Sequence, residues 1–123
     1  MNEAKGKKRQ FFGTDGVRDI ANQGMMTPDA AMRLGSAYAV FLMENGVERP
    51  KIAVGRDTRL SGEMLQSALM AGIASSGGDA VDLGVIPTPG VSSAALRGPF
   101  SGGAVVSASH NPAEYNGIKF LDG

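Results

Sequence analysis

The sequence predicts a small three-layer α/β domain in which a mixed, mostly parallel sheet of about four strands is flanked by helices. Short apolar runs at 51–55, 79–86 and 103–106 alternate with segments of helical pattern. Such alternation is typical of parallel strands joined by right-handed helical crossovers. The 18 glycines lie mainly where predicted elements end, which indicates tight turns rather than disorder. A chain of 123 residues is long enough for one hydrophobic core.

Composition excludes several classes of function. Twelve basic and twelve acidic residues cancel, so we expect neither nucleic acid nor a membrane surface as partner. The absence of cysteine and the single histidine exclude a disulfide scaffold, a thiolate metal site and a histidine zinc cluster. We expect a cytoplasmic location. Residues 1–8 are predicted to be a basic flexible tail, and residues 9–123 the domain itself.

The pattern in the first half of the chain predicts one extended piece, one strand and two helices. The segment 9–19, RQFFGTDGVRD, has the pattern of a brief extended piece ending in a glycine-bracketed loop. Thr27 is expected to cap a helix that begins at Pro28 and stops at 45–46, Asn-Gly. After the strand at 51–55, Ser61 is expected to cap a second helix.

Two leucines flank that second cap. Leu60 before it and Leu65 after it are placed for a hydrophobic staple, and Leu65 also begins an apolar stripe that faces the core. Gly77 and Gly78 are expected to end this helix.

The second half of the chain predicts a further helix and the remaining strands. Thr88 is placed to cap a short third helix that runs to about Leu96. The segment 117–122, GIKFLD, alternates well enough for a last strand, which we expect at an edge of the sheet beside an antiparallel neighbour. Three polar segments, GRDTR, IPTP and SASHNP, directly follow predicted strands. Because ligands of such sheets gather at the carboxyl ends of the strands, we expect these segments to share one rim.

The segment 103–123 is the predicted reactive loop, because a short strand delivers two serines and the only histidine into a turn stiffened by Pro112. A Ser-His hydrolase is the first hypothesis to test. Successive residues of an extended segment point to opposite sides, so His110 is badly placed to act as base for Ser109. The G-x-S-x-G pattern is also missing around Ser109, as are both glycine-rich nucleotide-binding signatures.

Cationic groups near the predicted loops favour phosphate chemistry instead. They are Arg18, Arg56, Arg59, His110 and Lys119. A phosphoserine carries about 1.5 to 2 negative charges at neutral pH, which such groups would stabilise. For Arg59, as for Arg33 on its helix, we expect an exposed charge without a role. The scattered carboxylates show no metal-ligand spacing.

Four segments together closely resemble the α-D-phosphohexomutase family. They are FFGTDGVRD near the N-terminus, GRDTRLSG, IPTPG and VVSASHNPAEYNGIKF. They follow the family's order over nearly the whole chain. Within the family, FGTDGVR, SASHNP and NGIKF are most similar to the bacterial enzymes that act on glucosamine phosphate.

The resemblance implies a role for each candidate site residue. Ser109 matches the phosphorylated serine that gives and retakes a phosphoryl group, with Ser107 as a neighbour on the same face. Arg18 and Lys119 match basic positions that flank the phosphoserine and are candidates for general acid and base assistance. His110 matches an active-site position that contacts the phosphoserine region or the sugar.

The implied reaction interconverts glucosamine 6-phosphate and glucosamine 1-phosphate through a bisphosphate intermediate. Family members use Mg²⁺ held by the serine phosphate, here on Ser109, and by an aspartate-rich loop. They have four domains, of which this chain resembles only the first, so we expect domains 2–4 to be absent and the chain alone to be inactive. Asp19 stands where the family usually has glycine, which alters loop flexibility or places a carboxylate near Arg18.

The sequence also allows two other hypotheses about the function. The same domain also fits a phosphomannomutase or phosphoglucomutase, which shares the serine chemistry and acts on another hexose phosphate. A hypothesis from a different class of function is that the domain is a non-catalytic module that associates with a second copy of itself, for instance as a homodimer. In the enzymatic readings the partner is a hexose or hexosamine phosphate bound together with the missing domains.

Overall fold

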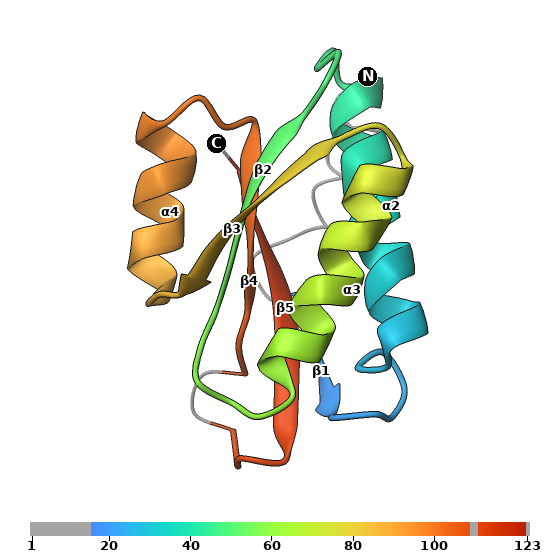
Figure 1. Ribbon diagram of the computed structural model, residues 1–123, viewed down its shortest axis with the longest axis vertical. Coiled ribbons are helices and arrows are strands. Elements are labelled where there is room, and N and C mark those ends of the chain that lie inside the picture. Colours follow the sequence, from blue (N-terminus) through green and yellow to red (C-terminus); the bar gives the residue numbers. More distant parts are fainter. Residues whose placement is uncertain (1–15, 109–110, 123) are drawn as a thin grey trace, which may run out of the picture.

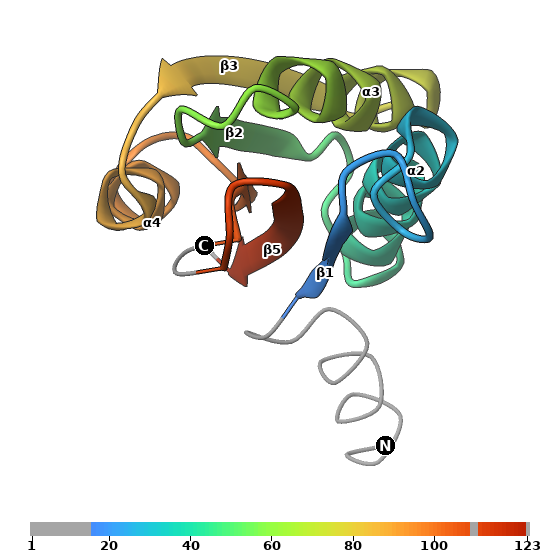
Figure 2. The ribbon, with the colours of Figure 1, turned by 90° about the horizontal axis from the view of Figure 1, so that it is seen from below.

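The structure is a computed structural model that describes residues 16–108 and 111–122. They form one sheet with α4 on one face and α2 and α3 on the other (Figures 1 and 2). The predicted fold class is confirmed. The strands are β1 (Val17–Ile20), β2 (Lys51–Arg56), β3 (Asp79–Val85), β4 (Gly102–Val106) and β5 (Tyr115–Asp122). The helices are α2 (Pro28–Glu44), α3 (Gly62–Ser75) and α4 (Thr88–Arg97).

The sheet is mixed and has the strand order β1-β5-β4-β2-β3. Strand β2 pairs in parallel with β3 and β4, whereas β5 pairs antiparallel with β4 and β1. The last strand is therefore antiparallel to its neighbours, as predicted, but the prediction that it lies at an edge is wrong. One edge is β3, and the edge next to β5 is formed by β1, which the sequence pattern placed at the end of a loop. Four residues are too few to show a period, so only the pairing partner reveals this strand.

Helix α2 begins and ends where the sequence predicts. The hydroxyl of Thr27 accepts a hydrogen bond from the backbone N–H of Ala30 at 3.1 Å, which is the expected N-cap. Pro28 occupies the first helical position, and the helix closes at Asn45 before a glycine with a φ of 96°.

Helix α3 begins at the predicted place but not by the predicted contacts. Ser61 is the N-cap residue, yet its side chain makes no capping bond and instead accepts a hydrogen bond from the amide nitrogen of Asn116 at 2.8 Å. Leu60 is fully exposed while Leu65 is fully buried, so the predicted hydrophobic staple is wrong. The Ser61 hydroxyl thus bonds to a residue of β5 instead of capping its own helix.

Helix α4 also departs from the expected cap. Pro87 takes the N-cap position and Thr88 becomes the first helical residue, without a capping bond from its side chain. The helix packs on the sheet through Val91 and Ala95, both buried. Because the cap lies one residue earlier than predicted, the Thr88 hydroxyl does not cap the helix.

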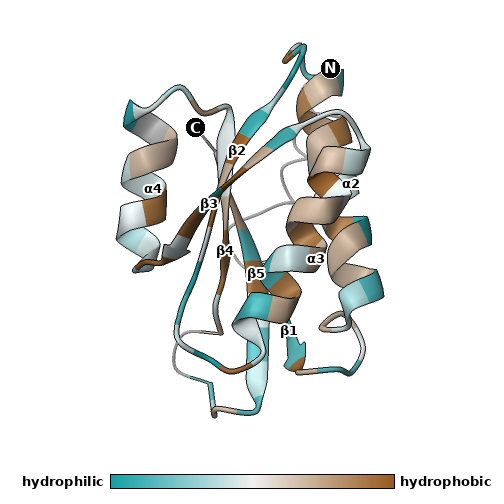
Figure 3. Ribbon diagram, viewed as in Figure 1, coloured by the Kyte–Doolittle hydropathy of each residue, from teal (hydrophilic) through white to brown (hydrophobic). Residues whose placement is uncertain are grey.

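The main core lies between the sheet and the pair α2 and α3. Its fully buried members include Tyr38, Ile52, Leu69 and Ile73. Gly35 and Gly72 let the two helices touch, because a Cβ atom at either position would overlap a backbone carbonyl of the other helix. Hydrophobic residues make up much of α2 and α3, whereas the loop between β2 and α3 is largely hydrophilic (Figure 3). The polar end of the molecule therefore lies where the strands stop.

Candidate functional site

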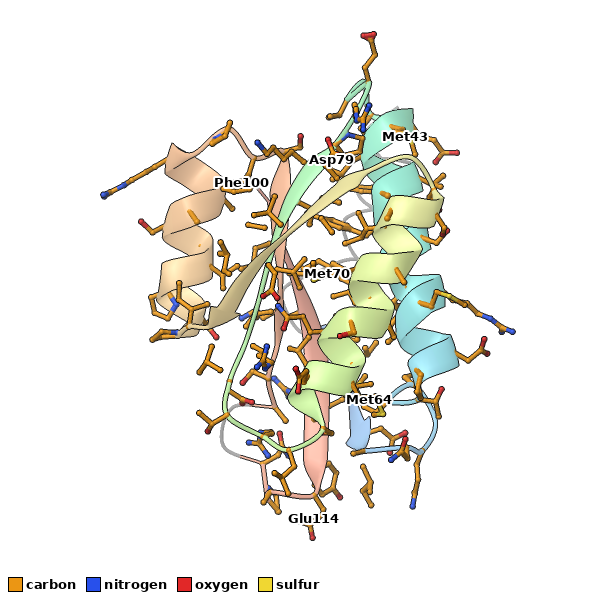
Figure 4. All side chains as sticks on the ribbon, in the orientation of Figure 1. Met43, Met64, Met70, Asp79, Phe100 and Glu114 are labelled. Atoms are coloured by element: carbon orange, nitrogen blue, oxygen red, sulfur yellow. The ribbon has the colours of Figure 1, made fainter. Side chains whose placement is uncertain are left out.

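The polar segments that follow β2, β3 and β4 meet at one rim of the sheet. These three strands are parallel and neighbouring, so their carboxyl ends share an edge, as the sequence predicts. Glu114, in the turn between β4 and β5, marks this end of the molecule, and Asp79 and Phe100 lie at the opposite end (Figure 4). The candidate site is therefore at the end of the sheet marked by Glu114.

A small pocket of about 120 Å³ opens at this rim on the face that α4 covers. Four polar residues contribute to its lining, and the remaining walls are apolar. The lining consists of Val17, Arg18, Thr88, Val105, Ser107, Ile118 and Lys119. Strands β1, β4 and β5 and the start of α4 thus converge on one hollow.

Strand register explains why two distant basic residues meet there. Lys119 lies opposite Val105 in the β4–β5 ladder, and Arg18 lies opposite Gly117 in the β1–β5 ladder. Residues 117 and 119 of one strand share a face because side chains alternate. The structure therefore brings together Arg18 and Lys119 in the lining of one pocket. They lie 101 positions apart in the sequence, and both were predicted to be site residues.

The charge of this pocket suits an anion. Arg18 is exposed and Lys119 is half-buried, and the lining includes no carboxylate. Thr88 places the first turn of α4 at the pocket, and the positive end of a helix dipole favours negative charge. A phosphate ester would find two cations and two hydroxyl groups there.

Two of the predicted site residues, Ser109 and His110, lie outside the described residues. Their neighbours define where the segment starts and ends. Ser107, two residues before Ser109, lines the pocket and donates its backbone N–H to the carbonyl of Gly117 at 2.8 Å. Asn111 donates its backbone N–H to the carbonyl of Ala108 at 3.0 Å. Ser107 thus lies at the pocket, and the described residues on either side of Ser109 and His110 are joined by a backbone hydrogen bond.

Arg59 contradicts the expectation of an exposed charge without a role. Only 12% of its side chain is accessible, and its guanidinium binds the carboxylate of Asp57 at 3.1 Å. The same guanidinium donates hydrogen bonds to the carbonyl oxygens of Asn111, Pro112 and Tyr115. Sequence reasoning missed this role because those acceptors are backbone atoms, which no residue pattern marks. Arg33 is exposed as expected and pairs with Asp29 at 3.1 Å.

Arg56, another of the candidate cations, is held by a buried amide. Gln66 is 2% exposed and accepts a hydrogen bond from Arg56 at 2.6 Å. Its amide nitrogen donates to the carbonyl of Val54 at 2.9 Å and to the carboxylate of Asp82 at 2.8 Å. This network fixes Arg56 on the α3 face of the sheet, whereas the pocket opens on the α4 face.

Asp19, the departure from the family pattern, turns away from the pocket. Its carboxylate accepts the backbone N–H of Ile20 at 2.8 Å and packs against Gly24. The carboxylate thus takes part in the local turn, and an effect of Asp19 on the flexibility of the loop stays a prediction.

The described residues make no metal site by themselves. Among residues 16–108 and 111–122, no three histidine or acidic side chains are clustered so that they could hold a metal ion. Asp57, an acidic residue in the loop after β2, already accepts the Nε–H of Arg59. The residues described here therefore do not fit a protein-only Mg²⁺ site.

The opposite end of the molecule carries a separate ion pair. The Asp79 carboxylate binds Arg49 at 3.0 and 3.1 Å and raises the pKa of this arginine above its ordinary value. Over the part of the chain that the structure describes, no helix is long and apolar enough to cross a membrane. The ion pair between Arg49 and Asp79 does not contribute to the lining of the pocket.

Comparison with known proteins identifies the family. Residues 9–123 match the model of phosphoglucomutase/phosphomannomutase, alpha/beta/alpha domain I. A phosphoglucosamine mutase from Clostridium tetani is 56% identical over 113 residues, and a phosphoglucomutase/phosphomannomutase from Thermococcus kodakarensis is 51% identical over the same length. Each match covers 92% of this chain but 25% of the relative.

A solved structure agrees with these matches. The crystal structure of a putative phosphomannomutase from Thermus thermophilus superimposes with a TM-score of 0.80 at 38% identity, covering 90% of this chain and 25% of that one. The chain thus spans about a quarter of the length of the relatives it matches. It belongs to the phosphoglucomutase/phosphomannomutase family, of which it carries domain I.

Proposed function

We propose that this chain is the phosphoserine-bearing domain of a mutase that interconverts glucosamine 6-phosphate and glucosamine 1-phosphate, with Ser109 as the phosphoryl carrier. The observation that supports this most is the pocket that Ser107 lines together with Arg18 from β1 and Lys119 from β5. Identity of 54–56% to several phosphoglucosamine mutases supports the choice of sugar. We place the protein in the cytoplasm, where sugar phosphates are available.

The proposed chemistry consists of two phosphoryl transfers in opposite directions. In the first, the bond between phosphorus and the Ser109 oxygen breaks and a bond to the sugar O1 forms, while O1 gives its proton to a base and the serine oxygen takes one up. In the second, the bond between phosphorus and O6 of the bisphosphate breaks and a bond to the Ser109 oxygen forms, while the serine hydroxyl loses its proton and O6 takes one up. The sugar has then exchanged the position of its phosphate, and the serine is phosphorylated again.

The two basic side chains would serve these steps differently. Phosphoryl transfer is accelerated mainly by positioning and by charge stabilisation. Lys119 is half-buried at the pocket, where its ammonium can neutralise the phosphate and exchange a proton with the sugar oxygen. Arg18 lines the same pocket with a planar guanidinium, whose several N–H donors match the oxygens of a phosphate group. We assign charge stabilisation to Arg18 and contact with the phosphoserine or the sugar to His110.

The remaining parts of the site must come from other residues than those described. Relatives are about four times as long as the stretch that they share with this chain. Because the described residues offer no cluster of metal ligands, we expect Mg²⁺ to be bound through the Ser109 phosphate together with residues of the other domains. By the same reasoning, the chain alone is expected to be inactive.

A hybrid enzyme tests the proposal. Residues 9–123 replace the matching quarter of the C. tetani phosphoglucosamine mutase, and conversion of glucosamine 6-phosphate is measured. We expect turnover that Ser109→Ala abolishes and that Ser93→Ala, on α4 but outside the pocket lining, leaves unchanged. Turnover that survives Ser109→Ala would refute the carrier role.

The second candidate is a phosphomannomutase or phosphoglucomutase, which the 51% identity to the T. kodakarensis protein supports. A parallel hybrid places the same residues in that protein and is assayed with mannose and glucose phosphates. Activity of this hybrid alone would favour the second candidate over the first.

A further inference from the structure

The guanidinium group of Arg59 connects the turn at 111–115 to the loop that follows β2. Arg59 donates from Nη1 to the carbonyl oxygens of Pro112 at 2.7 Å and Tyr115 at 3.1 Å. Its Nη2 donates to the carbonyl oxygen of Asn111 at 2.9 Å. Three backbone oxygens that are separated along the turn therefore converge on one side chain.

Asp57 fixes that side chain in turn. One of its carboxylate oxygens accepts the backbone N–H of Arg59 at 3.1 Å, and the other accepts the Nε–H at 3.1 Å. The Arg59 side chain is 12% exposed and that of Asp57 is 31% exposed, so solvent competes little for this pair. The orientation of the guanidinium is thus set from the β2 side before it reaches the turn.

Two further bonds join the same segments at their bases. The backbone N–H of Asp57 donates to the carbonyl of Val106 at 3.1 Å, and the amide of Asn116 donates to the hydroxyl of Ser61 at 2.8 Å. Asn116 is fully buried. The loop after β2 therefore contacts the chain both before and after residues 107–111, and Arg59 lies in this loop.

We propose that Arg59, held by Asp57, is a positioning residue that holds the turn at 111–115, which follows Ser109 in the chain, in place for the proposed phosphoryl transfer. The proposal rests on the function proposed above. Arginine is suited to this role because its planar fork presents five N–H donors, whereas the lysine ammonium is a compact point charge with three. Without those donors the three carbonyl oxygens would lose their shared partner, and the turn would sample other conformations.

The effect on catalysis would come through geometry. Displacement of a reacting group by about 1 Å costs on the order of a hundredfold in rate. Arg59 binds backbone oxygens of the turn and does not line the pocket that Arg18 and Lys119 share. Its loss should therefore lower kcat and leave the KM for the sugar phosphate nearly unchanged.

Amide hydrogen exchange on the 123-residue chain tests positioning without any catalysis. The amides of Asn111 and Tyr115 are hydrogen-bonded within the turn and report its opening. In Arg59→Lys, and more weakly in Asp57→Asn, we expect these amides to exchange at least about tenfold faster while strands β2 and β3 keep their rates. Arg33→Gln, which removes an exposed ion pair on α2, is the matched control and should change neither.

The two readouts separate failure of this proposal from failure of the proposed function. Unchanged exchange at Asn111 and Tyr115 in both variants would overturn the positioning role, and so would equal acceleration throughout the chain, which would make Arg59 a general stabilising residue. In the hybrid enzyme, a fall in kcat of about a hundredfold at constant KM is expected for Arg59→Lys. If Ser109→Ala retains turnover, the proposed function fails, whereas the exchange data still decide the role of Arg59.

Discussion

Lys119 is the residue of the pocket for which the proposal expects the largest catalytic effect. Its half-buried ammonium shares the lining with Ser107 and Arg18. In the hybrid enzyme, Lys119→Met should lower kcat by about 10²- to 10⁴-fold, the range of a lost acid or base. Lys119→Arg keeps the charge and should lose less. Steady-state kinetics measure both, and equal activity of Lys119→Met and the unmodified hybrid would remove Lys119 from the mechanism.

Gln66 carries a different prediction, which concerns stability. Its buried amide satisfies Arg56, Asp82 and the carbonyl of Val54 together. Gln66→Leu leaves these groups without that partner, so the free energy of unfolding should fall by about 1–3 kcal/mol. Urea denaturation measures the change. Arg33→Gln is the control and should shift stability by less than about 0.5 kcal/mol, because exposed ion pairs contribute little. An equally small change for Gln66→Leu would show that the network is not stabilising.

At the scale of elements, the crossing of α2 and α3 depends on two glycines. A Cβ atom at Gly72 would overlap the carbonyl of Met32 on α2. Gly72→Ala should therefore destabilise the chain by about 1–3 kcal/mol through overpacking, despite alanine's better helix propensity. The neighbouring exposed Ala71 provides the control, since Ala71→Ser adds one atom away from the crossing. A more stable Gly72→Ala protein in thermal unfolding would mean that the helices can move apart at no cost.

The two faces of the sheet should also differ in local stability. Helix α3 packs on both α2 and the sheet and buries Leu65, Leu69 and Ile73, whereas Val91 and Ala95 are the buried hydrophobic residues of α4 among those whose side chains the structure describes. Amides of α4 should therefore exchange faster than those of α3, by about tenfold or more, because fewer apolar contacts hold that helix. Native-state hydrogen exchange measures this. Equal protection of α3 and α4 would show that the domain opens only as a whole.

The elements also show what the sequence can and cannot predict. Thr27, Pro28 and the glycines after α2 and α3 act locally, so their caps and stops follow from residue type alone. Ser61 and Leu60 follow the same local pattern, yet a long-range bond from Asn116 overrides it. Strand β1 was missed for a related reason, because its four residues are defined by pairing with β5.

On the scale of the whole molecule, the sheet explains why a site could be predicted at all. Parallel strands β2, β3 and β4 deliver their following segments to one rim, so the location of the site follows from the order of elements. Convergence of Arg18 and Lys119 depends on the antiparallel register of β1 with β5, which residue patterns do not contain. The role of Arg59 depends on backbone acceptors and was likewise invisible. The residues that carry the proposed chemistry were thus found from motifs, and the residue that positions them from geometry.

The central claim is that Ser109 carries the phosphoryl group that reaches the sugar. The most direct test is a single-turnover experiment on the hybrid enzyme, loaded with radiolabelled phosphate from a hexose bisphosphate and then mixed with glucosamine 6-phosphate. Mass spectrometry of the digested enzyme locates the label before mixing, and chromatography of the sugars follows it afterwards. The account predicts that the label lies on Ser109 and passes to the sugar at least as fast as kcat. Label on another residue, or label that stays on Ser109 while product forms, would contradict it.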